Sequence, residues 1–372
     1  MANDCGCGTN FKEIKKFKPL EKSGSSCCAE KSIKPEIWMT GFKETKCGKI
    51  PVISTDLTSV DIHGGWKARW GINRMDYSIE PGIYGFGDPD VNSPVLVTAN
   101  YKLTFDKVRK ELKGLNGWLL VLDTKGINVW CAAGKGTFGT EELVKRVTLH
   151  RISELVSHRT LILPQLGATG VCAYEVTKNT GFKIKFGPVR ACDIREYINN
   201  DYTKTESMRT VYFDLPDRMA ISVIELIHSL KYLLIAFIAI ALFSLIENKA
   251  FTYRILTDFL PFLLAFFTGA TVFPAVLPYL PFRSFALKGY ILGMILTALI
   301  VFTTAGGSWN AAFLFLVIPP IVSFISLYFT GASTYTSLAG SKVEVAVSLP
   351  LIGISIGLGL VIKISSLIKG VI

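Results

Sequence analysis

The feature that most constrains this chain is a series of five apolar segments in its last third. A helix needs roughly 20 apolar residues to cross the hydrocarbon core of a bilayer. The segments are separated by short polar connections and span about 229–246, 256–278, 285–305, 311–331 and 345–367. The pattern therefore predicts a membrane domain of five transmembrane helices over residues 229–372.

Charged residues are divided unevenly between the two parts of the chain. Residues 229–372 hold 8 of the 40 lysines and arginines and 3 of the 29 acidic residues, and residues 1–228 hold the rest. The mean hydropathy of +0.40 is thus an average over a charge-poor membrane part and an ordinary soluble part. With 50% hydrophobic residues the chain is neither disordered nor collagen-like. The net charge of +11 forms no basic stripe with interleaved aromatics, so nucleic acid is not an expected partner.

The N-terminal sequence bears on where the soluble part lies. It has no apolar core of the kind that a signal peptide carries. We therefore expect a multi-pass protein of the plasma membrane whose soluble domain is cytoplasmic. Lysine and arginine flank the spans in a ratio of 5 to 4, which does not set the orientation. No span carries a charge near its centre, and this favours an anchor over a transporter.

The soluble part divides into three predicted regions. Residues 1–50 form a polar segment with five cysteines that we expect to be largely irregular, residues 51–205 form an α/β domain, and residues 206–228 form a linker. Within the α/β domain, strand-like and helix-like patterns alternate. We expect strands at 93–100 and 118–123, helices at 105–112 and 140–148 with Thr104 and Thr140 as their N-caps, and a short extended piece at 128–131. Such alternation predicts a mostly parallel sheet covered by helices.

The sequence NVWCAAGKGTFGT at 128–140 follows the second predicted strand, and three interpretations of it remain open. Gly134, Gly136 and Gly139 fit a nucleotide-binding G-x-G-x-x-G pattern, but WCAA separates them from the strand. Alternatively, Cys131 is a small buried hydrophobic residue, which is the commonest role of an unpaired cysteine. In the third interpretation Cys131 is a reactive thiolate at a helix N-terminus, where small neighbours leave room for a flat group.

The segment NVWCAAGK resembles the signature of the HgcA family, the membrane-anchored corrinoid proteins of microbial mercury methylation. Residues 66–90, 93–112 and 118–147 are also similar to that family. They are similar as well to the corrinoid-binding domain in the large subunit of the corrinoid iron–sulfur protein of acetyl-CoA metabolism. The resemblance implies a Rossmann-like α/β corrinoid-binding domain followed by an all-α membrane domain of five transmembrane helices.

The resemblance also implies an activity and a site. The chain is expected to be a corrinoid-dependent methyltransferase that transfers a methyl group from cobalt to Hg(II) and forms methylmercury. Its cobalamin-type corrinoid is expected base-off, with the Cys131 thiolate as lower axial ligand and catalytic residue. The residues implied to contact the cofactor are Thr98, Thr104, Asn128, Val129, Trp130, Cys131, Ala132, Ala133, Gly134 and Lys135.

The remaining cysteines bear on the partners. The five cysteines at 5, 7, 27, 28 and 47 have no C-x2-C spacing, so we expect no intrinsic iron–sulfur cluster. The resemblance then implies a ferredoxin-like protein with two [4Fe–4S] clusters as reductant, and a methyl-folate methyltransferase as methyl donor. Thiolates suit soft metals, and one hypothesis is that Cys27 and Cys28 capture Hg(II). The alternative is that they are incidental thiols of a polar tail.

Two other functions compete with mercury methylation. The first is a membrane-anchored corrinoid methyl carrier of one-carbon metabolism, in the acetyl-CoA pathway, with a different acceptor. Cys131 argues against it, because the relatives in that pathway lack the thiolate. The second is a transporter with a cytoplasmic nucleotide-sensing domain, which the charge-free span centres and the interrupted glycine pattern disfavour.

Overall fold

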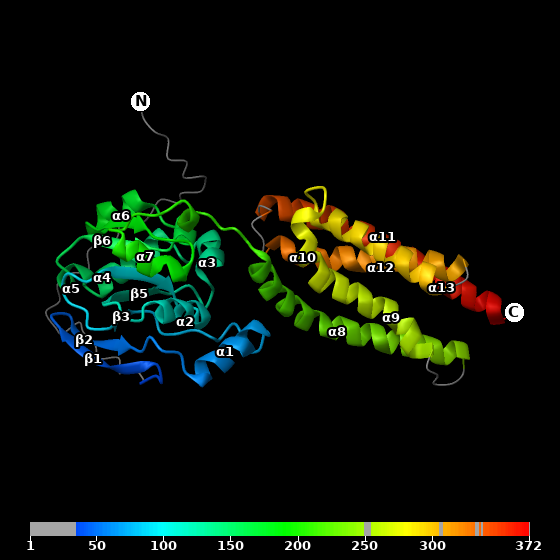
Figure 1. Ribbon diagram of the computed structural model, residues 1–372, viewed down its shortest axis with the longest axis horizontal. Coiled ribbons are helices and arrows are strands. Elements are labelled where there is room, and N and C mark those ends of the chain that lie inside the picture. The colour runs from blue at the N-terminus through cyan, green and yellow to red at the C-terminus, as the bar shows by residue number, and fades with distance from the viewer. Residues whose placement is uncertain (1–34, 249–253, 305–307, 332–334, 336–337, 372) are drawn as a thin grey trace, which may run out of the picture. The chain divides into compact units, whose positions relative to one another are not determined.

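The computed structural model describes residues 35–371, except 249–253, 305–307, 332–334 and 336–337. By its internal contacts the chain divides into two units (Figure 1). The first runs to Thr210, and the second runs from Val211 and also takes in Arg69–Gly71. The first is an α/β unit and the second is helical, which confirms the predicted fold class.

A seven-stranded mixed sheet forms the centre of the described part of the first unit, in the order β1-β2-β3-β5-β4-β6-β7. β4 pairs in parallel with β5 on one side and with β6 on the other, and β6 pairs in parallel with β7. β2 and β3 are parallel, whereas the β1–β2 and β3–β5 pairs are antiparallel. The strands are β1 (Met39–Thr45), β2 (Gly48–Ile53), β3 (Ile83–Phe86), β4 (Val95–Ala99), β5 (Gly117–Leu122), β6 (Thr160–Leu163) and β7 (Lys183–Phe186).

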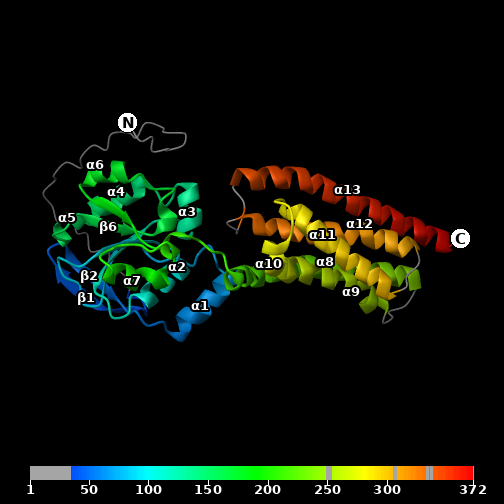
Figure 2. The ribbon, with the colours of Figure 1, turned by 45° about the horizontal axis from the view of Figure 1, so that its top comes forward.

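Helices cover both faces of this sheet (Figure 2). Alternate residues of a strand point to opposite faces: Val97 of β4 belongs to one apolar cluster and Leu96 to the other. The first cluster takes in α3 (Val129–Lys135), α4 (Thr140–Leu149), α5 (Ile152–Leu155) and α6 (Ala173–Thr180). The second takes in α2 (Lys102–Glu111) and α7 (Ile194–Asn199). The remaining helix, α1 (Ser59–Arg69), precedes β3.

Several local expectations were wrong. Residues 39–53 are not irregular, because β1 and β2 form a hairpin at the sheet edge. Thr104 does not cap α2, which begins at Lys102 after Tyr101 and so places Thr104 in its first turn. Of the predicted extended piece 128–131, only the cap residue Asn128 has an extended backbone, and residues 129–131 form the first turn of α3. Thr140 is the first residue of α4 and follows the cap residue Gly139. The Thr140 hydroxyl instead accepts the Cys172 N–H at 2.9 Å.

The second unit contains, among the described residues, five helical stretches long and apolar enough to cross a membrane. This confirms the five predicted spans. The stretches are Leu215–Ile246, Arg254–Tyr279, Phe285–Thr304, Asn310–Gly331 and Gly340–Ser366. Helix α8 (Leu215–Asn248) carries the first of them. Because α8 begins at Leu215, most of the segment 206–228 is helical, and the predicted linker is correspondingly shorter.

The second stretch contains α9 (Arg254–Phe267) and the short α10 (Phe273–Val276). The other three contain α11 (Phe285–Thr304), α12 (Ser308–Leu327) and α13 (Leu338–Val371). A single turn of π-helix joins α9 to α10. Two buried cations bond backbone carbonyls at the end of this interrupted span: Arg218 donates to the Pro274 carbonyl at 2.8 Å, and Lys288 donates to the Leu277 carbonyl at 3.1 Å. These bonds satisfy acceptors that the broken helix leaves without backbone partners.

Candidate cofactor site

The carboxyl edge of the sheet has a topological switch point at β4. The chain leaves β4 through α2 to reach β5 on one side, then crosses back through α3–α5 to reach β6 on the other. The order β5-β4-β6-β7 is that of doubly wound sheets, whose ligands bind in the crevice where the connections diverge. Helix α3 packs against the turn Gln165–Gly167, which follows β6. The motif carrying Cys131 therefore lies at the carboxyl edge of the sheet.

The turn that leads from β5 into α3 is held by Asn100, the residue after β4. The Asn100 Oδ1 accepts the Thr124 N–H at 3.0 Å, the Gly126 N–H at 3.1 Å and the Thr124 hydroxyl at 2.8 Å. The Thr124 hydroxyl also lies 2.6 Å from the Ile127 carbonyl. Asn100 and Thr124 are buried. The sequence analysis missed both as site-positioning residues; the only local signal was a polar residue directly after a buried strand.

Asn128 fixes the first turn of α3. Its side-chain oxygen accepts the Cys131 N–H at 2.9 Å, and its carbonyl accepts the Ala132 N–H at 2.9 Å. An asparagine N-cap satisfies a donor that the helix cannot bond internally. The cap places Cys131 as the third helical residue, with an exposed thiol that forms no disulfide with another cysteine of the described residues. This exposure excludes the interpretation of Cys131 as a buried hydrophobic residue.

Helical phase divides the predicted contact residues of α3 into two sets. Val129, Ala132 and Ala133 are buried in the apolar cluster on this face of the sheet. Two of the others are large side chains on the outside: Trp130 is 41% exposed, and Lys135 is exposed. Ala132 and Ala133 therefore anchor the helix rather than lining open space beside the turn. The outward set is Trp130, Cys131, Gly134 and Lys135.

Gly136 and Gly139 of the motif form part of the turn that follows α3. Gly136 has a φ of 79° and ends α3 in the left-handed region, which glycine adopts at no steric cost. A Cβ on Gly139 would lie 2.6 Å from the Gly136 carbonyl oxygen. These glycines sit between two helices and not between a strand and a helix, so they do not form a dinucleotide-binding loop. This removes the structural basis for a nucleotide-sensing domain.

The two predicted threonines lie on the other side of the sheet. Thr98 is the fourth residue of β4, and alternation places it on the α2 face, opposite the face of Val97 and α3. Its hydroxyl is buried and has no hydrogen-bond partner among the described residues. Thr104 is partly exposed in the first turn of α2. The structure therefore brings Asn128, Trp130, Cys131 and Lys135 together on α3 and places both threonines apart from them.

The candidates for Hg(II) capture, Cys27 and Cys28, lie outside the described residues. Cys47 follows β1, and its thiol donates to the Arg151 carbonyl at 3.5 Å. Cys192 is exposed beside Asp193. In the part of the chain that the structure describes, no three histidine, cysteine or carboxylate side chains gather as a metal site.

The first unit is thus a doubly wound α/β domain with an exposed, capped cysteine at its topological switch point, the place where ligands bind in such sheets. It is joined to a helical region with five stretches long and apolar enough to cross a membrane. The family model for the CO dehydrogenase/acetyl-CoA synthase delta subunit matches residues 73–198, about a third of the chain. That range takes in β3–β7 and the whole of α3. The predicted similarity to a protein of acetyl-CoA metabolism is confirmed over this range. It does not extend to the membrane unit.

Curated relatives give the same result. The gamma subunit of the acetyl-CoA decarbonylase/synthase complex from Archaeoglobus fulgidus is 33% identical over 135 residues, which are 36% of this chain and 28% of that protein. The same subunit from Methanopyrus kandleri is 34% identical over 130 residues, 34% of this chain and 28% of that protein. The Methanocaldococcus jannaschii subunit is 33% identical over 133 residues, 35% and 27% of the two chains. The chain therefore spans less than a third of the length of these relatives.

Proposed function

We propose that this chain is a membrane-anchored corrinoid protein that transfers methyl groups, with its corrinoid-binding domain at residues 51–205. The family match over 73–198 and the acetyl-CoA decarbonylase/synthase relatives support a role in one-carbon transfer. The single observation that carries the finer assignment is the exposed Cys131 thiol on a capped helix beside the topological switch point of the sheet. None of the relatives' names supplies a mercury substrate, so that part rests on the resemblance and on the chemistry of Cys131.

The residues present fit a corrinoid. A base-off corrinoid leaves its metal open to a protein donor, and Cys131 would offer an exposed soft donor. Trp130 presents a flat apolar side chain next to it, and Lys135 presents a cation suited to the acidic or amide edge of a bound group. The unpartnered hydroxyl of Thr98 is a further polar atom near this edge of the sheet. In this proposal Thr98 and Thr104 contribute from the α2 side.

The corrinoid, when bound, supplies a cobalt centre that carries a methyl group. The chain's own residues would hold one sulfur donor for that metal in a fixed position. Asn128 fixes the Cys131 backbone, and the buried Val129, Ala132 and Ala133 keep α3 from turning. Cys131 must lose its thiol proton to ligate, and a thiolate donates more electron density to a metal than a neutral ligand does. That donation favours release of the methyl group with its bonding electrons.

A soft electrophile accepts such a methyl group best, and Hg(II) is one. The proposed reaction is therefore methylation of Hg(II) to methylmercury, after which a ferredoxin-like protein with two [4Fe–4S] clusters supplies electrons and a methyl-folate methyltransferase resupplies the methyl group. We also propose that the α/β unit lies in the cytoplasm, where thiols stay reduced. Labelling of Cys131 in sealed inside-out and right-side-out vesicles tests that placement.

A second candidate is favoured by one specific observation, the names of the relatives. All three are subunits of an acetyl-CoA decarbonylase/synthase complex. In this candidate the chain carries methyl groups in the acetyl-CoA pathway and hands them to another acceptor. The outward-facing thiol of Cys131 then has no assigned role in transfer. The two candidates therefore make different predictions for the same substitution.

The test uses the full-length protein in detergent or nanodiscs, reconstituted with a cobalt corrinoid. We expect a visible absorption spectrum characteristic of thiolate ligation in the wild type and a shifted spectrum in Cys131→Ala, with Cys192→Ala as the exposed-cysteine control. Methylmercury formation with a reducing partner should fall at least tenfold in Cys131→Ala and stay unchanged in Cys192→Ala. A Cys131→Ala protein with the wild-type spectrum and full transfer to a non-mercury acceptor would support the second candidate.

A further inference from the structure

A large cavity lies inside the membrane unit, well away in sequence from the α/β site. Its volume is about 740 Å³, within the range of roughly 300–1,000 Å³ typical of small-molecule pockets. Side chains from α8, α9, α11, α12 and α13 line it, and most of them are apolar. Phe262 and Phe313 face one another across part of the wall, with ring centroids 6.4 Å apart. An apolar cavity of this size in a bilayer-spanning bundle suits a hydrocarbon chain.

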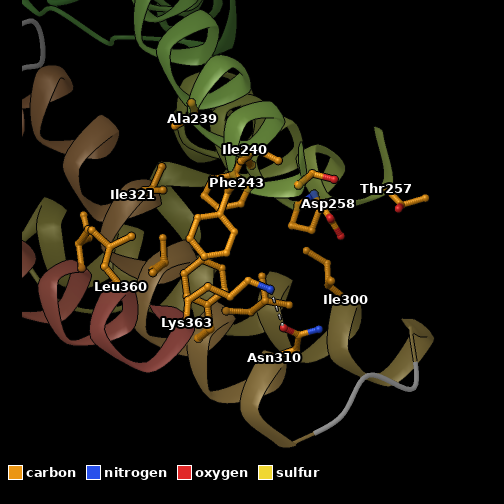
Figure 3. A pocket seen from close by; sticks show the side chains of 18 of the residues that line it. Ala239, Ile240, Phe243, Thr257, Asp258, Ile300, Asn310, Ile321, Leu360 and Lys363 are labelled. Carbon is orange, nitrogen blue, oxygen red and sulfur yellow. Dashed lines mark hydrogen bonds between the residues drawn. The ribbon is translucent and has the colours of Figure 1, made fainter. Parts of the chain in front are cut away.

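Polar side chains gather at one end of the cavity. Lys363 of α13 donates to the Asn310 side-chain oxygen of α12 at 3.3 Å, and its amine lies 5.7 Å from the centre of the Phe243 ring. These contacts hold the cation at the cavity wall. Figure 3 shows Lys363 and Asn310 reaching each other there, with Thr257 and Asp258 at the start of α9. The cavity is thus apolar along its length, with a positioned cation, the Asp258 carboxylate and neutral hydrogen-bonding groups at one end.

The cavity also has a side opening. α8 packs mainly on α9, and α13 packs mainly on α12. Side chains of α8 and α13 nevertheless both line the cavity, and several stay exposed: Ile235 is 63% exposed, Leu360 51% and Ile364 49%. The spans of α8 and α13 are also the least buried of the five, at 11% and 6% of their most apolar windows. The bundle therefore leaves an apolar route between these two helices through which a chain can enter from the bilayer.

We infer that the cavity is a binding site for a membrane phospholipid, with one acyl chain in the apolar part and the phosphate at Lys363. The lysine ammonium is a compact positive charge, and it binds the phosphate of a lipid headgroup through charge-assisted hydrogen bonds. Asn310 adds a side-chain amide donor beside it. The acyl chain contributes by filling space that would otherwise lack packing contacts. The bound lipid joins α8 to α13, which make few contacts of their own.

The experiment uses the full chain in nanodiscs of phosphatidylcholine doped with equal phosphatidylglycerol and diacylglycerol of the same acyl chains. Native mass spectrometry of the released protein counts retained lipids. We expect one retained lipid per chain. We also expect an excess of retained phosphatidylglycerol over retained diacylglycerol, the two lipids that are added in equal amounts. Lys363→Gln should lower that excess roughly tenfold, because a charge-assisted hydrogen bond changes a binding constant by about that factor. Lys342→Gln, an exposed lysine on the same helix outside the cavity, should leave the excess unchanged.

A second variant tests the acyl-chain part separately. Ala236 lines the cavity on α8, and Ala236→Phe should reduce the retained lipid at least fivefold by occupying its space. Ala220→Phe, at an exposed position of α8 outside the cavity, is the matched control. Equal retention in Ala236→Phe and wild type would overturn the inference, as would an unchanged phospholipid excess in Lys363→Gln. Release of lipid-free dimers would also overturn it, because a second copy would then fill the opening.

Discussion

Replacement of Asn100 by alanine should loosen the turn that positions Cys131. The substitution removes the oxygen that accepts the N–H groups of Thr124 and Gly126 at 3.0 and 3.1 Å. The Thr124 hydroxyl keeps the Ile127 carbonyl as a partner, so two backbone donors are left unsatisfied. Each buried unsatisfied donor costs about 1–3 kcal/mol. Two such donors would cost about 2–6 kcal/mol. Because the neighbouring Lys125 is exposed and admits water, we expect the lower part of that sum, a loss of about 2–3 kcal/mol.

Urea unfolding of the full-length protein, followed by a probe in the α/β unit, measures this loss. Hydrogen exchange should accelerate in the segment 124–131 and stay unchanged in β6, which lies on the other side of β4. The matched control is Asn116→Ala, because the Asn116 side chain accepts only one exposed backbone hydrogen bond, from Asp88, in the described structure. If Asn100→Ala costs no more than Asn116→Ala and leaves exchange in 124–131 unchanged, then Asn100 does not hold this turn.

Substitutions at three further residues test other parts of the α/β unit. Asn128→Ala should cost about 1 kcal/mol and weaken corrinoid binding, whereas Asn128→Ser keeps a capping oxygen and should preserve both; urea unfolding and a corrinoid titration measure them. Lys102→Met should cost about 3–5 kcal/mol in urea unfolding, because Lys102 lies 2.7 Å from Asp61 and 2.6 Å from Asp106 in a buried cluster. Burial lowers the pKa of His150 to about 4, so the unfolded state gains a proton at higher pH than the folded state. Its contribution, at most about 3 kcal/mol, is present above pH 6.5 and is lost as the pH falls towards 4; unfolding of His150→Gln should show a correspondingly weaker pH dependence.

Much of the architecture could be predicted from the sequence, because burial leaves a local pattern. A bilayer-spanning helix needs a long apolar segment, and all five segments were visible without any tertiary information. The central strands β4 and β5 are buried throughout and, apart from Thr98, carry no polar side chain because both faces are covered, and they too were predicted. The β1–β2 hairpin was missed for the complementary reason. β1 lies at the sheet edge with no fully buried residue, so its sequence Met39–Thr45 has no continuous apolar pattern.

In the candidate site too, contacts between residues close in sequence could be predicted, and contacts between residues far apart in sequence could not. Asn128 caps a helix that starts one residue later, and its partner Cys131 is three residues away, so a local motif predicts that contact. Asn100 and Thr124 are 24 residues apart and meet only because β4 and β5 are parallel neighbours that end at the same edge. No local pattern encodes such a pairing. The position of Cys131 therefore depends on the hydrogen bonds between Asn100 and Thr124, which the motif does not contain. A family resemblance centred on the motif predicts Cys131 as a metal ligand without predicting the residues that hold it in place.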